Sequence, residues 1–247
     1  MHDIEIFPDS QALTIAALEL FLSLGNQAIK SKGSFSVALS GGSTPKALYQ
    51  QLGDSKNQNM LAWENVHLFW GDERYLSFGD SNLNYSMVKE TLLDHLNLPE
   101  ENICRVPVEM EVRLAAFSYE EELRRFFDGE WPEFDLILLG MGDDGHTASL
   151  FPKSAGLNEE HRWFIANQLP KEQNWRLTLT KNAVNHASNI LVLVQGRSKA
   201  NMLKEVLIGP YDPINKPIQL ISPHQGKLLW FIDEEAASQL LSDDPSR

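Results

Sequence analysis

Two glycine-rich segments hold most of the side chains that could do chemistry in this chain. The first is Ser-Gly-Gly-Ser-Thr-Pro at 40–45, and the second is Gly-Met-Gly-Asp-Asp-Gly-His-Thr at 140–147. Each follows a short apolar run, 35–39 or 135–139, of the kind that forms a buried strand. In an α/β protein, a glycine-rich turn from a strand into a helix is a usual position for phosphate binding and for proton transfer.

The second segment places a histidine two residues after a carboxylate. Histidine exchanges a proton near neutral pH, so His146 can take one from water, and Asp144 can fix the tautomer of its ring. A zinc site is the competing interpretation. However, no cysteine or second histidine lies at ligand spacing, since His161 is fifteen residues away. The pattern therefore favours a general base over a metal ligand.

The first segment has the composition of an anion-binding turn. The backbone at Gly41 and Gly42 can come close to a ligand, and Ser43 and Thr44 add hydroxyls. We expect Thr44 to be the N-cap and Pro45 the first residue of a helix, whose N-terminal amides then face the ligand. The segment has neither a Walker A lysine nor the Gly-x-Gly-x-x-Gly spacing. It fits a phosphate monoester, with an ordinary strand-to-helix turn as the alternative.

Acids and a guanidinium follow another predicted strand, at 66–70. Asp72 and Arg74 can supply a carboxylate for proton transfer or orientation and a bidentate anion clamp, with Glu73 between them. A surface ion-pair cluster is the alternative. Ligand sites of open parallel sheets lie at the carboxyl ends of strands, and this position favours a functional interpretation.

The formal net charge of −13 would repel a phosphorylated ligand, so any phosphate site must be locally basic. Arg176 begins the predicted strand 176–180, and Lys199 stands at the start of a predicted helix that ends near Leu207. An ammonium at a helix N-terminus opposes the helix dipole unless an anion is bound there. We therefore expect Arg176 and Lys199 to bind the anion, with solvated surface charges as the alternative.

Composition limits the class of protein. The 247 residues are 43% apolar, enough for a sizeable core in one domain over 1–247, with residues 242–247 as a frayed tail. The acidic total argues against nucleic acid or an anionic membrane as a partner. The single cysteine, Cys104, fits a reducing compartment. No secretory signal is expected, nor an apolar run approaching ~18–20 residues. These features predict a soluble, cytoplasmic protein.

Strands and helices alternate along the chain, which predicts an α/β fold: one domain with a mainly parallel, modified Rossmann-like sheet and helices on both faces. Two shorter segments, 163–167 and 176–180, alternate apolar with polar residues and predict a small added β element. The main predicted strands are 35–39, 66–70, 135–139, 190–194 and 228–232.

Taken together, the motifs resemble the 6-phosphogluconolactonase family. The matching stretches occur in family order over nearly the whole chain: Ser40–Pro45, Trp70–Arg74, Ser81–Asn82, Gly140–Pro152, Arg176–Thr180, Gly196–Ala200 and Trp230–Ala236. The run Gly140–Pro152 is highly specific, whereas Ser40–Pro45 is shared with sugar-phosphate isomerases and deaminases of the same superfamily. The segments 75–80 and 104–113 diverge from the family pattern.

The resemblance implies hydrolysis of 6-phospho-D-glucono-1,5-lactone to 6-phosphogluconate in the oxidative pentose phosphate pathway. It implies no metal and no organic cofactor, a small-molecule phosphorylated lactone as the partner, and a monomer or small homo-oligomer. The resemblance implies that His146, oriented by Asp144, is a general base, and that Arg74 stabilises the oxyanion or joins the phosphate clamp. Asp72 and Glu73 would then position Arg74 or the sugar hydroxyls. The phosphate ligands that it implies are Gly41, Gly42, Ser43, Thr44, Arg176 and Lys199.

Two other functions remain open. A glucosamine-6-phosphate deaminase or isomerase would use a carboxylate at the place of Asp72 to move a proton between carbons. A non-catalytic sugar-phosphate sensor would keep the fold and lose the chemistry. The sequence Gly-Asp-Glu-Arg at 71–74 and the run 147–152 favour the lactonase, and the presence of His146 and Arg74 argues against the sensor.

Overall fold

A seven-stranded sheet forms the centre of the molecule. The computed structural model describes residues 3–169 and 174–241, so the frayed tail predicted at 242–247 lies outside the described residues. The strand order is β1-β10-β9-β6-β2-β3-β5, and all of these pairings are parallel. The bounds are β1 Asp3–Phe7, β2 Phe35–Leu39, β3 Val66–Trp70, β5 Ile103–Cys104, β6 Leu136–Gly140, β9 Asn189–Val194 and β10 Lys227–Asp233.

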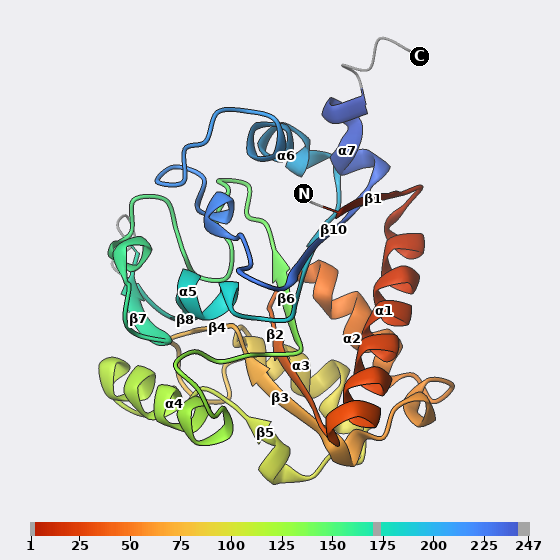
Figure 1. Ribbon diagram of the computed structural model, residues 1–247, viewed down its shortest axis with the longest axis vertical. Helices are drawn as coiled ribbons and strands as arrows, with labels where there is room; N and C mark the ends of the chain where they lie inside the picture. Colours follow the sequence, from red (N-terminus) through yellow and green to blue (C-terminus); the bar gives the residue numbers. More distant parts are fainter. Residues whose placement is uncertain (1–2, 170–173, 242–247) are drawn as a thin grey trace.

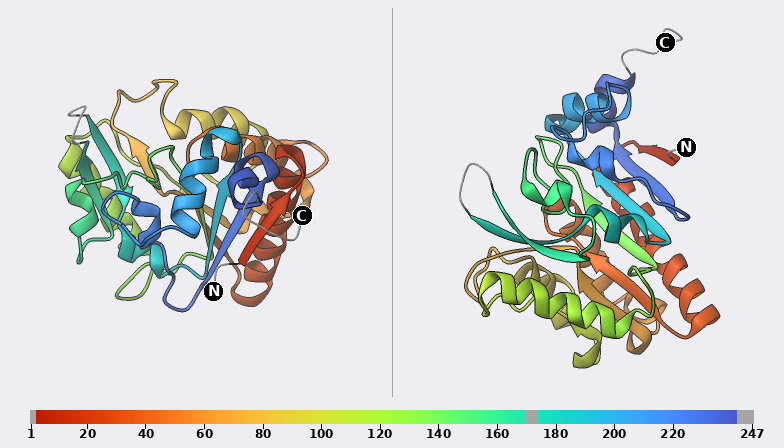
Figure 2. Two further views of the ribbon diagram at one scale, coloured as in Figure 1. Left: turned by 90° about the horizontal axis from the view of Figure 1, so that it is seen from above. Right: turned by 60° about the vertical axis from the view of Figure 1, so that its left-hand side comes forward.

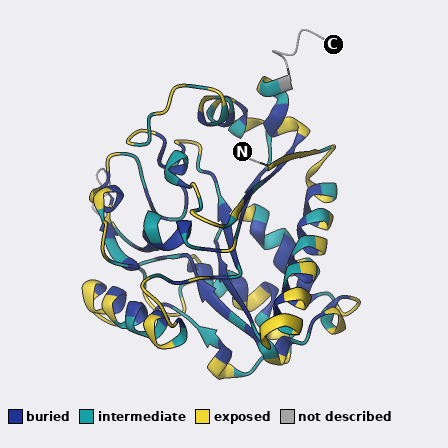
Figure 3. Cartoon of the chain, in the orientation of Figure 1, coloured by how far each residue is buried: buried dark blue, intermediate teal, exposed yellow. Residues whose placement is uncertain are grey.

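The middle strands are covered on both faces, which explains why they are continuous apolar runs. All five residues of β2 are buried, as are the first four of β6 and the last five of β9. Figure 3 shows this buried band through the centre of the molecule. The prediction of a mainly parallel α/β sheet is confirmed.

A second, antiparallel sheet has the order β4-β8-β7. Its strands are β4 Asp72–Arg74, β7 Phe164–Gln168 and β8 Trp175–Leu179. The pairing of β7 with β8 confirms the predicted β element. Strand β4 was not predicted. Because β4 follows β3 after only Gly71, it carries the chain directly from the main sheet into the small one.

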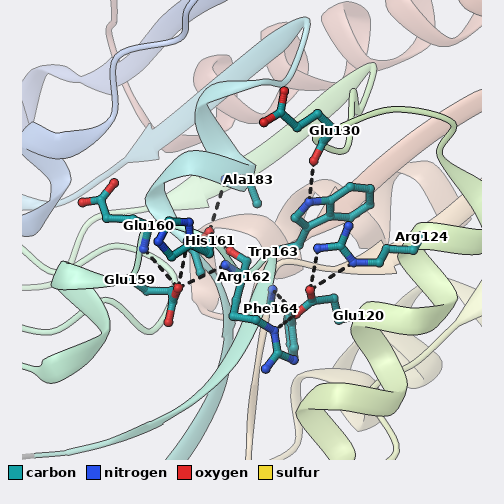
Figure 4. Close-up of polar contacts among 11 residues, drawn as sticks. Glu120, Arg124, Glu130, Glu159, Glu160, His161, Arg162, Trp163, Phe164 and Ala183 are labelled. Atoms are coloured by element: carbon teal, nitrogen blue, oxygen red, sulfur yellow. Dashed lines mark hydrogen bonds and ion pairs between the residues drawn. The ribbon is translucent and has the colours of Figure 1, made fainter.

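The small sheet is fixed to helix α4 (Val112–Phe126) by a buried carboxylate. Glu120 is 3% exposed and accepts hydrogen bonds from Arg124 Nη2 at 2.8 Å and from Arg162 Nε at 2.6 Å. Figure 4 shows both guanidiniums converging on it. The Arg124 guanidinium also lies 4.2 Å from the centre of the Trp163 ring. These contacts give β7 and β8 a defined position relative to the main sheet.

Helices cover both sides of the main sheet. Helices α1 and α2 lie together on one side, while α4, α5 and the small sheet lie on the other, as Figures 1 and 2 show from different directions. Helices α6 and α7 pack against each other near the C-terminal end of the chain. The remaining bounds are α1 Ser10–Lys32, α2 Ser43–Gly53, α3 Asn84–Thr91, α5 Lys181–Asn185, α6 Ala200–Leu207 and α7 Glu234–Leu241.

Helix α1 corrects one expectation from the sequence. With 23 residues and a mean hydropathy of 1.4 over its apolar window, it is long and apolar enough to cross a membrane by length and composition alone. In the fold, Leu13, Ala17 and Phe21 are at most 1% exposed and belong to the hydrophobic core. One side of this helix therefore belongs to the hydrophobic core, and 39% of its apolar window is buried inside the fold.

Helix α1 is capped at both ends by residue types typical of those positions, whereas the start of α2 differs from the prediction. The Asp9 side chain caps α1, and Gly33 ends that helix in the left-handed conformation. At α2, however, the N-cap is Gly42, so Thr44 is not the cap and Pro45 is the third helical residue. The helix begins earlier because Gly42, with φ of 104°, adopts a backbone conformation that L side chains rarely adopt.

Candidate active site

A cavity of about 300 Å³ lies at the carboxyl ends of the middle strands. Strands β9, β6, β2 and β3 are neighbours, so the segments that follow them meet at one edge of the sheet. The cavity brings together most of the residues predicted for the site. Its lining includes Gly41, Gly42, Ser43, Thr44, Asp72, Arg74, His146 and Lys199, together with Asn84 and Asp143.

The turn after β6 holds the histidine. His146 Nδ1 lies 2.5 Å from Asp144 Oδ1, and the same carboxylate oxygen accepts a hydrogen bond from the His146 backbone N–H at 3.1 Å. The His146 ring stacks on Phe151 with the ring centres 4.3 Å apart. The hydrogen bond with His146 lowers the pKa of Asp144 below its usual value, so this carboxyl is ionised at neutral pH. Asp144 therefore accepts from Nδ1, and Nε2 is left to take a proton.

Two glycines make this turn possible. A Cβ on Gly142 would lie 2.1 Å from His146 Nδ1, so only glycine leaves room for the ring. Gly145 has φ of 80°, a conformation that favours glycine. The turn is closed by Gly142 N–H, which donates to His146 O at 2.8 Å, and by the Thr147 hydroxyl, which donates to Gly140 O at 2.8 Å.

Asp72 is a buried carboxyl on the wall of the same cavity. Its Oδ2 accepts a 2.6 Å hydrogen bond from the Ser149 hydroxyl, and its Oδ1 accepts one from Asn84 Nδ2 at 3.2 Å. Burial raises the pKa of Asp72, against the lowering effect of that Ser149 bond and of the nearby positive charges. Neither Asn84 nor Ser149 was singled out in the sequence, although Ser149 lies inside the run Gly140–Pro152.

The alternation of strand β4 separates Glu73 from its neighbours. Arg74 lines the cavity and donates from Nη1 to Asn82 O at 2.5 Å. Glu73 is 1% exposed and accepts three backbone N–H bonds, from Arg74, Asn84 and Tyr85, at 2.7–2.8 Å. The Glu73 side chain therefore holds the backbone of Arg74 and the N-terminus of α3, and it is not among the residues that line the cavity.

The first glycine-rich turn packs closely against that helix. A Cβ on Gly41 would lie 2.0 Å from Asn84 Oδ1, so glycine is required here by contact. The buried Tyr49 hydroxyl accepts from the Ser40 backbone N–H and donates to Ser40 O, at 3.0 and 2.9 Å. The turn is thus held from both sides, with Ser43 and Thr44 on the cavity wall.

The two basic residues predicted to bind the anion lie at different places. Lys199 lines the cavity, and its Nζ is 2.7 Å from Asp143 Oδ1. Arg176 is not among the lining residues. It pairs with Arg74 in the register of β4 and β8, and its charge acts on Asp72. No group of three His, Cys, Asp or Glu side chains that could hold a metal ion occurs in residues 3–169 and 174–241.

Fold and site together define an α/β protein with a polar cavity and a histidine–carboxylate pair at the carboxyl edge of a parallel sheet. The chain belongs to the family described as glucosamine-6-phosphate isomerases/6-phosphogluconolactonase, whose model matches residues 8–230.

Individual relatives agree with this assignment. A 6-phosphogluconolactonase of Nostoc sp. is 40% identical over 96% of this chain and 98% of the relative, and one of Synechocystis sp. is 39% identical over the same shares. Among solved structures, 6-phosphogluconolactonase from Trypanosoma cruzi superimposes with a TM-score of 0.85 at 26% identity, covering 97% of each chain.

Proposed function

We propose that this protein is a 6-phosphogluconolactonase that hydrolyses 6-phospho-D-glucono-1,5-lactone to 6-phosphogluconate in the oxidative pentose phosphate pathway. The single observation that carries the proposal is that His146, paired with Asp144 at 2.5 Å, lines the same cavity as the glycine-rich turn and Lys199. A proton acceptor and an anion-binding wall thus share one small cavity. The relatives named above carry the same activity in their names.

The chemistry requires a water to attack the lactone carbonyl carbon. His146 Nε2 takes a proton from that water while Asp144 stabilises the imidazolium through Nδ1. The carbonyl oxygen becomes an oxyanion, and Arg74 lies on the cavity wall where a guanidinium can stabilise it. When the bond from the carbonyl carbon to the ring oxygen breaks, the imidazolium returns its proton to that oxygen. The products are a carboxylic acid and a hydroxyl.

We assign the phosphate group of the substrate to the part of the cavity lined by the first glycine-rich turn. The amides and hydroxyls of Gly41, Gly42, Ser43 and Thr44 lie at the start of α2, where the helix dipole favours an anion. Lys199 adds an ammonium to the lining of the same cavity. Arg176 is proposed to contribute mainly through the charge that it adds beside Asp72 and Arg74.

The decisive test compares two variants in a lactone hydrolysis assay corrected for spontaneous opening. His146→Asn should lower kcat by about 10²–10⁴-fold, because it removes the general base and keeps the cavity. Lys199→Ala should instead raise KM for the phosphorylated lactone, with a smaller effect on kcat. Wild-type turnover by His146→Asn would refute the proposed base, and an unchanged KM in Lys199→Ala would remove Lys199 from the phosphate site.

The buried carboxyl of Asp72 is the observation that favours a second candidate reaction, that of a deaminase. Asp72 is a buried carboxyl of raised pKa on the cavity wall, and a glucosamine-6-phosphate deaminase would need a carboxylate there to move a proton between carbons. Release of ammonia from glucosamine-6-phosphate discriminates between the two reactions. We expect none, and steady ammonia release would favour the deaminase.

We also propose that the enzyme works in the cytoplasm, as a monomer or small homo-oligomer, with the phosphorylated lactone as its partner and with no nucleic acid or membrane partner. The single cysteine and the net charge of −13 support this proposal. Fractionation of cells and light scattering of the purified protein test location and assembly.

A further inference from the structure

Asp143 lies in the turn 140–147 that holds His146, but it is not the carboxylate that pairs with the histidine. Its neighbour Asp144 binds His146, whereas the Asp143 carboxylate faces the cavity and pairs with Lys199 Nζ at 2.7 Å. Within residues 3–169 and 174–241, Lys199 is the one partner of this carboxylate. The Asp143 side chain is 73% exposed, against 23% for Lys199. Of the two, Asp143 has the greater freedom to turn into solvent.

This pair changes the charge that an incoming anion meets. The cavity wall carries two basic side chains, Arg74 and Lys199, and two acids, Asp72 and Asp143. Asp143 therefore offsets one of the two positive charges. A phosphate monoester brings up to two negative charges and three strong acceptor oxygens, so it competes with Asp143 for the Lys199 ammonium.

We propose that Asp143 is a displaceable counter-ion of Lys199. It holds the ammonium at the cavity when no anion is bound, yields it to the phosphate group of the substrate, and takes it back as the phosphorylated product leaves. An exposed ion pair of this kind is weak, which allows the exchange. The inference rests on the proposed function, because it takes Lys199 as a ligand of the phosphate group.

The test replaces Asp143 by its neutral isostere. Asp143→Asn should lower both KM for the phosphorylated lactone and the inhibition constant of 6-phosphogluconate by about two- to five-fold. This ratio corresponds to the free energy of one exposed ion pair, which the anion no longer has to break. In a Lys199→Met background the same substitution should have no effect. An unchanged or raised inhibition constant overturns the proposal. Equal tightening without Lys199 also overturns it, because Asp143 would then act on the anion directly.

A matched control comes from another ion pair. Glu160 pairs with Lys181 at 2.6 Å, with side-chain exposures of 55% and 17%, and neither residue lines the cavity. Glu160→Gln removes the same charge and should leave both constants unchanged. If the wild type hydrolyses no phosphorylated lactone, the proposed function fails. Binding of inorganic phosphate, measured by calorimetry on wild type and Asp143→Asn, still tests the exchange.

Discussion

At the scale of single residues, the geometry of the His146–Asp144 pair depends on the absence of a side chain at Gly142. His146 Nδ1 occupies the space that a Cβ on Gly142 would fill, at 2.1 Å from it, and Asp144 Oδ1 lies 2.8 Å from the same point. The hydrogen bond that selects the tautomer of His146 is therefore formed over a bare backbone. Any larger residue at 142 must move the ring or the carboxylate.

Gly142→Ala should reduce kcat by at least about 10²-fold, because displacing the base removes most of its contribution. Gly140→Ala is the matched control for folding, since a Cβ at 140 meets nothing within 4 Å. Activity and thermal unfolding are measured for both variants. Comparable kcat values in wild type and Gly142→Ala would show that the turn relaxes freely, and the geometric argument would fail.

Individual contacts within the site could be predicted from sequence only where the two partners are close in the chain. His146 and Asp144 are two residues apart, so their pairing is visible as a pattern. The hydroxyl that donates to Asp72 comes from Ser149, 77 residues away, and this contact appears only once the segment after β6 packs against β4. Asn84 gave no signal because its importance comes from contact with Gly41 and Asp72, not from its chemistry.

At the scale of elements, strand β4 explains several differences between the predicted and observed structures. A buried strand of five residues is recognisable, but three residues of mixed charge, Asp72–Arg74, resemble a loop in sequence. Strand β1 was also missed, because four of its five residues are exposed at the edge of the sheet. Interior strands were predicted correctly since continuous burial leaves continuous apolar runs.

Strand β4 also contains Glu73, whose titration should affect how the free energy of unfolding depends on pH. Burial raises the pKa of Glu73 from 4.5 to about 7, although three backbone N–H bonds oppose that shift. Between pH 4.5 and about 7 the folded protein therefore keeps a proton that the unfolded chain has lost. The contribution of Glu73 is fully present below this range and is lost as pH rises through it.

Glu73→Gln removes this titration and should flatten the fall of the unfolding free energy across that range, by on the order of 1–3 kcal/mol. Denaturant unfolding of both proteins at several pH values gives the two slopes. Replacing an exposed acid such as Glu64 by Gln should leave the slope as it is in the wild type. Equal slopes for wild type and Glu73→Gln would mean that the carboxyl is ionised throughout.

At the scale of the whole molecule, a net charge of −13 surrounds a cavity proposed to bind an anion. The net charge of the protein and the basic groups of the cavity act on the substrate over different distances. The total charge repels a phosphorylated substrate at long range, whereas Lys199, Arg74 and the start of α2 attract it at short range. Salt distinguishes the long-range repulsion from the short-range attraction, because the Debye length falls from ~30 Å at ~0.01 M to ~8 Å at ~0.15 M.

We therefore expect kcat/KM for the phosphorylated lactone to rise, by about two- to five-fold, as potassium chloride increases from ~0.01 to ~0.15 M. Screening over this range removes the long-range repulsion before it weakens the contacts inside the cavity. Chloride is preferred to sulfate, which would compete for a phosphate site. The uncharged glucono-1,5-lactone serves as the control and should show no such rise, since it feels no net charge. A steady fall of kcat/KM from the lowest salt would mean that the basic wall governs the approach of the substrate as well as its binding.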